Sequence, residues 1–235
     1  KRGFGYVCFK YAKGCVISLK NQEKVFKEVR KVTKELIRCG LAEEYNFPMM
    51  QKAEVVWEKY SDISYYLKNM EYSNIYSEIE KNHNFNVKLP DGGILQLMYR
   101  FNSHGTELES HRLAYYPSPS YENYQNDAEL YDADYLYGDI LNKDVLPVII
   151  RADYSRKKVK SQIHHPYSHI TLGDYKNCRI PADRPISPIQ FVKFIMEHFY
   201  YEPSSQLKYN FKLESIVQFD EHIAEIDTKK SRIII

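Results

Sequence analysis

The sequence predicts an α+β fold, with helices packed on one face of a largely antiparallel, curved β-sheet. Two segments, residues 21–39 and 188–200, carry apolar residues at helical spacing. Between them lie short β-prone runs separated by glycine- and proline-rich turns, a pattern typical of antiparallel strands. Hydrophobic residues make up 43% of the 235-residue chain, enough to fill a sizeable core. We therefore expect helices and an antiparallel sheet around one core.

Three segments are expected along the chain. Residues 1–20 form an N-terminal β-hairpin extension, because two β-prone runs flank Gly14. Residues 21–203 hold the main α+β domain. Residues 204–235 form a C-terminal extension that ends in a strand at 233–235.

The first helix of the main domain is predicted over residues 21–39. Its apolar positions recur at helical spacing, and its opposite face is basic. The apolar positions are Val25, Phe26, Val29, Val32, Leu36 and Ile37. Asn21 is expected to cap the start of this helix, and Gly40 to end it.

An antiparallel meander with one inserted helix is predicted for the middle of the chain. The expected strands cover residues 53–58, 63–67, 85–89, 94–101 and 107–115, and the expected helix covers 74–82 with Ser73 as its cap. The strongest turn signal is Pro-Asp-Gly-Gly at residues 90–93, where proline and glycine supply the backbone angles of a tight turn.

Residues 117–144 interrupt this pattern with an acidic, tyrosine-rich loop. A loop of this length inside a compact domain is usually functional. A strand is expected at 145–151, at a sheet edge or with a bulge because it contains a proline. Ser187 and Pro188 then open an amphipathic helix over 188–200.

The composition argues against several classes of protein. No apolar run approaches the roughly 18 residues of a membrane span, so no membrane partner is expected and the cytoplasm is the expected location. The four cysteines form no CxxC pair, which argues against a zinc ribbon or a disulfide framework. The chain contains no GxxxxGK loop and no GxSxG elbow, which disfavours P-loop nucleotide hydrolysis and α/β-hydrolase chemistry.

Residues 163–181 hold the densest group of side chains that transfer protons or bind anions. His165 and His169 are four residues apart, and in an extended segment that spacing places them on one face. We predict that they act as general acid and base, with His111 as a further catalytic candidate. Two alternatives stay open. The histidines could be structural, or they could bind a divalent metal with Asp153 or His111 as third ligand; no metal ligand is assigned and no other cofactor is expected.

Substrate binding is predicted for basic, aromatic and amide side chains near these histidines. They are Arg100, Arg112, Tyr115, Tyr116, Arg151, Asn177 and Arg179. The arginines would hold phosphates through charged hydrogen bonds, and the tyrosines would stack on bases. In the alternative interpretation, Arg100 and Arg112 pair with the acids of 121–139, and the basic run 151–160 is a solvated edge strand.

Several long runs carry a resemblance to a known family. They are LIRCGLAEEYNFP, LPDGGILQLMYRF, HRLAYYPSPSYENYQND, HPYSHITLGDYKNCRIP and SPIQFVKFIMEHFY. These runs resemble the bacterial domain of unknown function 2290 family, over roughly residues 30–201. The resemblance implies a prokaryotic, cytoplasmic protein, and it brings no activity, cofactor or catalytic residue with it. A weaker similarity to small toxins of bacterial toxin–antitoxin pairs is an analogy of pattern.

Two functions follow from these patterns. The first is a ribonuclease-like protein of a bacterial phage-defence or toxin-type locus that acts on RNA or DNA through the His/Arg/Tyr site. The second is a non-catalytic subunit that binds a partner protein from the same locus through the tyrosine-rich loop 117–144, since tyrosine is favoured at protein interfaces. The patterns leave open whether the chain is an enzyme.

Overall fold

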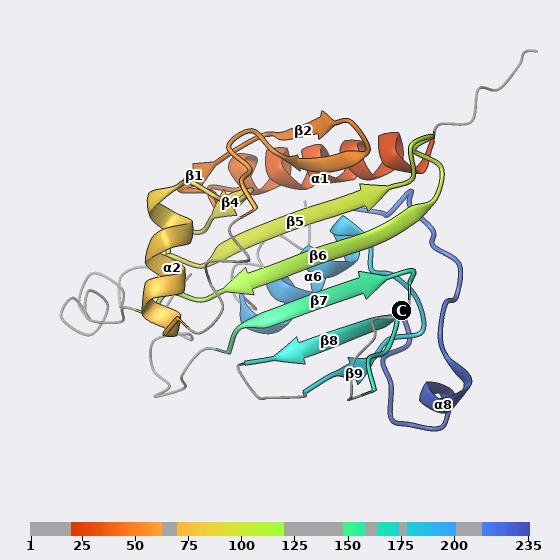
Figure 1. Ribbon diagram of the computed structural model, residues 1–235. Helices are drawn as coiled ribbons and strands as arrows, with labels where there is room; N and C mark the ends of the chain where they lie inside the picture. Colours follow the sequence, from red (N-terminus) through yellow and green to blue (C-terminus); the bar gives the residue numbers. More distant parts are fainter. Residues whose placement is uncertain (1–19, 63–69, 120–147, 158–163, 174–177, 201–212) are drawn as a thin grey trace, which may run out of the picture.

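The computed structural model describes residues 20–62, 70–119, 148–157, 164–173, 178–200 and 213–235. These residues form an open antiparallel β-sheet with helices packed against it (Figure 1). The α+β fold predicted from the sequence is therefore confirmed. None of the described helices combines the length and the apolar character needed to cross a membrane.

The described helices and strands follow the predicted order closely. The helices are α1 (Asn21–Arg38), α2 (Tyr72–Lys81), α6 (Pro188–Phe199) and α8 (Glu225–Thr228). The strands are β1 (Glu44–Tyr45), β2 (Pro48–Gln51), β3 (Glu54–Trp57), β4 (Val87–Lys88), β5 (Ile94–Phe101), β6 (Leu108–Tyr116), β7 (Ile150–Ser155), β8 (Ser168–Leu172) and β9 (Ile180–Pro181). The sequence did not predict β1, β2, β8 or β9. The predicted hairpin before residue 20, the predicted strand 63–67 and the loop beyond residue 119 lie outside the described residues.

Every described strand pair in the sheet is antiparallel. The strand order is β1-β4-β5-β6-β7-β8-β9, and the β2–β3 hairpin joins β5 on the same side as β4. The predicted strand 145–151 is displaced: β7 begins at Ile150 and continues to Ser155, where it pairs with β6 and β8. The late segment therefore contributes strands to the sheet, and its side chains must alternate between the two faces.

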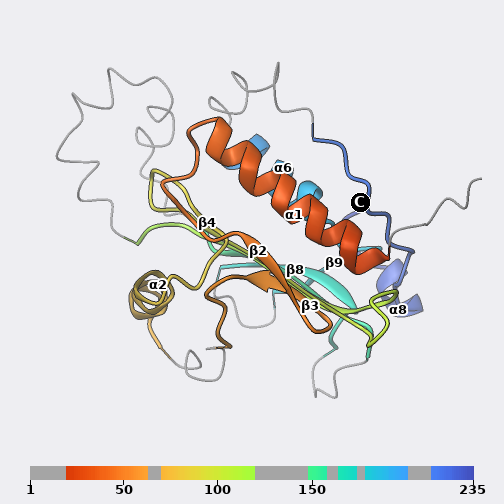
Figure 2. The same cartoon turned by 90° about the horizontal axis from the view of Figure 1, so that it is seen from above.

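Helices α1 and α6 cover one face of the sheet, as predicted (Figure 2). The buried apolar stripe of α1 consists of Val25, Val29, Val32 and Leu36. Helix α6 begins with a capping box, in which Ser187 Oγ accepts from Gln190 N at 3.2 Å and Gln190 Oε1 accepts from Ser187 N at 2.9 Å. This reciprocal pair satisfies two amides that the helix itself leaves unpaired.

Two of the predicted helix caps are wrong. The N-cap residue of α1 is Lys20, and the Asn21 side chain instead donates to a carbonyl of the β5–β6 turn at 2.8 Å. The N-cap residue of α2 is Glu71, so Ser73 lies inside the first turn. Gly40 follows α1 with a φ of +71°, a left-handed conformation that glycine adopts without steric cost.

Helix α2 lies on the opposite face of the sheet, over one end of the strands (Figure 2). Tyr76 and Ile79 pack there against Phe85, Ile94 and Tyr116 in a second, smaller apolar cluster. Beyond this end, no described helix covers the face that is turned to the viewer in Figure 1. The polar side chains that point from the strands to this face differ in exposure: Arg112 is exposed, Arg151 is partly exposed and His169 is buried.

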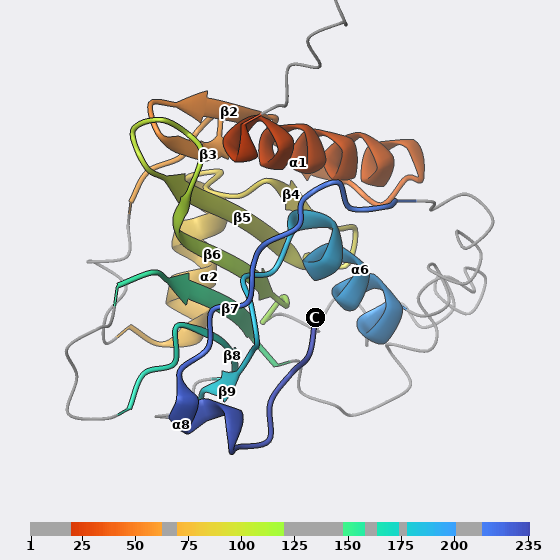
Figure 3. The ribbon, with the colours of Figure 1, turned by 90° about the vertical axis from the view of Figure 1, so that its right-hand side faces the viewer.

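The C-terminal segment 213–235 packs on the main domain (Figure 3). Leu213 and Val217 join the core beneath α1 and α6. The buried Glu28 of α1 accepts hydrogen bonds from this segment, as its Oε1 lies 2.8 Å from Val217 N. In place of the predicted strand 233–235, the segment makes an isolated parallel bridge between Ile233 and Ala182.

Candidate functional site

A row of charged side chains crosses three adjacent strands on the face opposite α1 and α6. In the register, Arg112 of β6 pairs with Asp153 of β7, which pairs with His169 of β8. Residues directly opposite in antiparallel strands share a face and lie about 5 Å apart. Arg112 Nε lies 3.6 Å from Asp153 Oδ1. The sheet thus aligns a cation, a carboxylate and an imidazole across strands that are far apart in sequence.

A second row runs beside the first, two residues along each strand. Ala114 pairs with Arg151, which pairs with Thr171. Because strand side chains alternate with a period of two, Arg151 and Thr171 share the face of the first row. Tyr116, two residues after Ala114 on β6, lies on the same face. Its burial raises the pKa of the Tyr116 hydroxyl, and the nearby guanidinium groups of Arg151 and Arg112 oppose that rise.

His165 and His169 meet at the end of the first row. Their ring centroids lie 4.6 Å apart and the rings are nearly perpendicular, at 87°. Burial lowers the pKa of His169 to about 4; the positive charges of His165 and Arg179 lower it further, and Asp153 opposes the change. His169 is therefore neutral at neutral pH and can accept a proton.

Two buried nitrogens of this cluster have no hydrogen-bond partner among the described residues. They are His169 Nδ1 and Arg179 Nη1. An unpaired buried polar atom costs free energy, about 1–3 kcal/mol, so native structures rarely leave one unsatisfied. An oxygen atom of a bound anion could accept from Arg179, and a hydroxyl group could pair with the imidazole.

His111 and Tyr115 are not brought into this cluster, because they lie on the helix-covered face. His111 is 2% exposed; its Nδ1 lies 3.2 Å from Ala152 O, and its Nε2 accepts from Ile186 N at 3.1 Å. Burial lowers the pKa of His111 to about 4. The hydroxyl of Tyr115 lies 2.9 Å from that of Tyr200, inside the core. Both nitrogens of His111 are occupied, so this ring has a structural role here.

The remaining predicted residues divide between paired and undescribed positions. Arg100 points to the open face, where its Nε donates to Oε1 of Glu54 on β3 at 2.7 Å. Among the described residues, its partner is thus a residue of a neighbouring strand; the segment 121–139 lies outside them. Asn177 lies outside the described residues. Taken together, the structure gathers Arg112, Arg151, Arg179, Tyr116, His165 and His169 on one face.

A neighbouring histidine ties this cluster to the C-terminal segment. His164 Nε2 lies 2.7 Å from Oδ1 and 2.8 Å from Oδ2 of Asp227 in α8. Asp227 is fully buried, and Lys230 also contacts it, at 3.0 Å. His164 immediately precedes His165, so α8 fixes the backbone that presents the candidate proton-transfer group.

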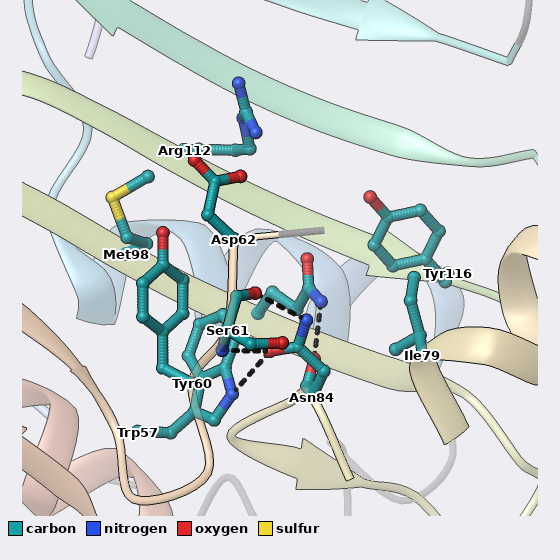
Figure 4. Close-up of a pocket in the computed structure, with 10 residues that line it drawn as sticks. Trp57, Tyr60, Ser61, Asp62, Ile79, Asn84, Met98, Arg112 and Tyr116 are labelled. Atoms are coloured by element: carbon teal, nitrogen blue, oxygen red, sulfur yellow. Dashed lines mark hydrogen bonds between the residues drawn. The ribbon is translucent and has the colours of Figure 1, made fainter. Parts of the chain in front are cut away.

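A hollow lies on the same face, at the end of the first row where Arg112 stands (Figure 4). The sequence did not predict it. Its cavity volume is about 50 Å³. The lining residues are Trp57, Tyr60, Ser61, Asp62, Ile79, Asn84, Gln96, Met98, Arg112 and Tyr116. They come from separate stretches of the chain, so no local sequence motif could have predicted the hollow. The one available signal was the alternation of Gln96 and Met98 with apolar residues in β5.

The metal alternative finds no complete ligand set in the described part of the chain. Within those residues, no three histidine, cysteine, aspartate or glutamate side chains are grouped so that they could hold a metal ion. The arrangement of the cluster fits anion binding and proton transfer, because arginines and imidazoles predominate in it.

Comparison with known proteins gives one match. No curated protein and no solved structure matches the chain. A family model described as an uncharacterized conserved protein (DUF2290) matches residues 41–235, which extends past the predicted limit of residue 201 and includes the C-terminal segment. The match contains the described strands of the sheet. It also contains the His/Arg cluster, which consists of Arg112, Arg151, His165, His169 and Arg179. The chain therefore belongs to the DUF2290 family.

Proposed function

We propose that this chain acts on nucleic acid through its open sheet face. Arg112, Arg151 and Arg179 would bind phosphates, and His165 and His169 would transfer protons. The observation that carries the proposal is the gathering of these five side chains, from three strands and two loops, on a face that no described helix covers. Guanidinium groups match phosphate oxygens in charge and geometry.

The chemistry that this arrangement fits best is cleavage of RNA. The 2′-oxygen attacks the phosphorus atom, and the neutral imidazole of His169 takes the 2′-hydroxyl proton. The bond from phosphorus to the 5′-oxygen breaks, and that oxygen takes a proton from His165 in its protonated form. The arginines would stabilise the charge that develops on the phosphate oxygens, which is commonly a large contribution to catalysis.

A cleavage assay tests the proposal directly. Labelled RNA and DNA are incubated with the wild-type chain and with His165→Ala/His169→Ala, each with and without a chelator. We expect RNA cleavage in the wild type and a loss of about 100-fold or more in the double variant. His104→Ala, an exposed histidine in the β5–β6 turn, is the matched control and should retain activity. Equal activity in the double variant and the wild type would remove the proposed role.

A further inference from the structure

The hollow beside the His/Arg face is built from side chains that hydrogen bonds hold in place. Asn84 Oδ1 accepts from Trp57 Nε1 at 3.0 Å and from Ser61 N at 3.3 Å. Asn84 Nδ2 donates to Ser61 O at 2.9 Å, and Asn84 O accepts from Gln96 Nε2 at 2.5 Å. The polar wall of the hollow is thus fixed before any ligand arrives.

Aromatic side chains form the other walls. The rings of Trp57 and Tyr60 meet edge to face with centroids 5.0 Å apart, and Tyr116 faces them from the opposite side (Figure 4). Asp62 and Arg112 point toward one another over the hollow. Aromatic walls, an amide and two charged side chains form the kind of pocket in which a flat, polar ring is held.

Gln96 supplies the group that would recognise such a ring. Among the described residues, its side chain makes one hydrogen bond, from Nε2 to Asn84 O, and its Oε1 accepts none. The amide therefore keeps a donor hydrogen and an acceptor oxygen. The edges of nucleobases present adjacent donors and acceptors, and glutamine pairs with them in a bidentate way.

The position of the hollow links it to the proposed phosphate site. Arg112 and Tyr116 line the hollow and also belong to the His/Arg face. Arg112 on β6 lies opposite Met98 on β5, and Gln96 is two residues further along that strand, so Arg112 and Gln96 are diagonal neighbours about 7–8 Å apart. His169 on β8 lies three strands away from β5, and neighbouring strands are about 4.8 Å apart. A base in the hollow would place its own phosphate near Arg112 and the adjoining nucleotide nearer the histidines.

We infer that this hollow receives one base of a single-stranded nucleic acid, next to the phosphate that the histidines address. The inference rests on the proposed function, and it names the form of the substrate. A cavity of about 50 Å³ admits the edge of one planar ring, with the rest of the ring at the open side. A paired base hides its edge in the duplex, so an unpaired base is required.

The single tryptophan of the chain gives this inference a site-specific test. Trp57 lies in the wall of the hollow, so its fluorescence reports on this place alone. We expect its emission to change in a saturable way when short single-stranded RNA or free nucleosides are added, after correction for their absorbance. Inorganic phosphate, which should occupy only the arginines, is expected to leave the emission unchanged.

Two variants with matched controls complete the experiment. Gln96→Leu should weaken nucleoside binding about fivefold to tenfold, which is the effect of one or two lost hydrogen bonds. Met98→Phe fills the hollow without removing a hydrogen bond and should abolish the emission change, so the test remains decisive if Gln96→Leu does not fold. Gln51→Leu and Met50→Phe make the same exchanges on the exposed strand β2 and should behave as wild type.

The anisotropy of a labelled single-stranded RNA, measured on the same samples, separates the two proposals. Binding of the RNA without any change in Trp57 emission would overturn the base site and leave the phosphate site standing. An equal affinity of Met98→Phe and wild type for nucleosides would overturn it too. Absence of RNA binding in the wild type would overturn both.

Discussion

His111 and His169 share one electrostatic property and differ in their surroundings. Burial lowers the pKa of each ring to about 4, well below the ordinary value of 6.5. Both nitrogens of His111 are paired in the core, whereas His169 Nδ1 has no partner among the described residues. The same shift therefore accompanies a fully paired ring in one case and a ring with an unpaired nitrogen in the other.

The stability of the fold is expected to fall as the pH drops from about 6.5 toward about 4. In that range the unfolded chain takes up protons that the two buried rings do not, so acid favours the unfolded state. Between about pH 7 and about pH 5, the loss is about 2 kcal/mol for each histidine. Urea unfolding curves recorded at these two pH values measure it.

His111→Gln isolates the contribution of one ring. Glutamine can still donate and accept a hydrogen bond, but it does not titrate, so the variant should lose about half of the pH dependence that the two rings cause. His104→Gln changes an exposed histidine and should keep the full dependence. Identical pH dependence in His111→Gln and wild type would show that the burial of His111 does not act in this way.

At this scale, the sequence identified types of residue but not their faces. His165, His169 and Arg179 could be singled out because they lie close together in one segment. The opposite placement of His111 and Arg112, which are adjacent in sequence, depends on which face of β6 the helices cover. A shift of the strand by one residue would exchange the two faces, and only tertiary packing fixes that register.

Among the elements, α1 is fastened to the C-terminal segment by one buried carboxylate. Oε1 of Glu28 accepts from Ser215 Oγ at 2.7 Å, Ile216 N at 2.6 Å and Val217 N at 2.8 Å. Glu28 is 1% exposed. Two backbone amides and a hydroxyl group from the C-terminal segment thus converge on one carboxylate oxygen of the first helix.

Glu28→Ala is expected to destabilise the fold by about 2–4 kcal/mol, because it leaves several buried donors without an acceptor. Glu28→Gln keeps one carbonyl oxygen and should cost less. Glu23→Ala alters the first turn of the same helix and is the matched control. Thermal and urea unfolding give the ranking. A Glu28→Ala variant as stable as the Glu23→Ala variant would contradict the assigned role.

The elements with strong periodicity were the ones that could be predicted. Helices α1 and α6 carry continuous apolar stripes of several turns, and β5 and β6 are long and rich in apolar residues. Strands β1 and β2 have two and four residues, and Met49 and Met50 of β2 are both exposed. Such short, unalternating segments become strands through pairing with a neighbour, and local sequence does not show this.

Basic side chains lie on two opposite sides of the part of the molecule that the structure describes. One is the outward face of α1, with Lys27, Arg30, Lys31, Lys34 and Arg38 exposed. The other is the open sheet face with Arg112 and Arg151 (Figure 2). Either surface could attract a polyanion, and the proposal assigns the nucleic acid to the second.

Salt dependence distinguishes the two surfaces. Each phosphate contact contributes about 0.7 to the slope of log affinity against log salt for a single strand. Arg112→Ala/Arg151→Ala should therefore reduce that slope by about 1.4, whereas Arg30→Ala/Lys34→Ala should leave it unchanged. The anisotropy of a labelled single-stranded RNA, measured over a salt series, gives the slope for each double variant. A reduced slope in the α1 variant alone would place the nucleic acid on the helix side.

For the molecule as a whole, the fold class and the family followed from sequence, and the site geometry did not. Apolar periodicity is a local property, so it indicates which elements form. The rows Arg112–Asp153–His169 and Ala114–Arg151–Thr171 arise from pairings across three strands, and the residues that line the hollow come from separate stretches of the chain. These contacts are set by how the strands are ordered, which no single segment encodes.

The pairing of His164 with Asp227 gives the last helix a mechanical role. The Asp227 carboxylate is buried, and its partner His164 immediately precedes His165. A displacement of α8 would therefore displace the loop that positions His165, the proposed acid. Loss of α8 would therefore remove this anchor of the loop.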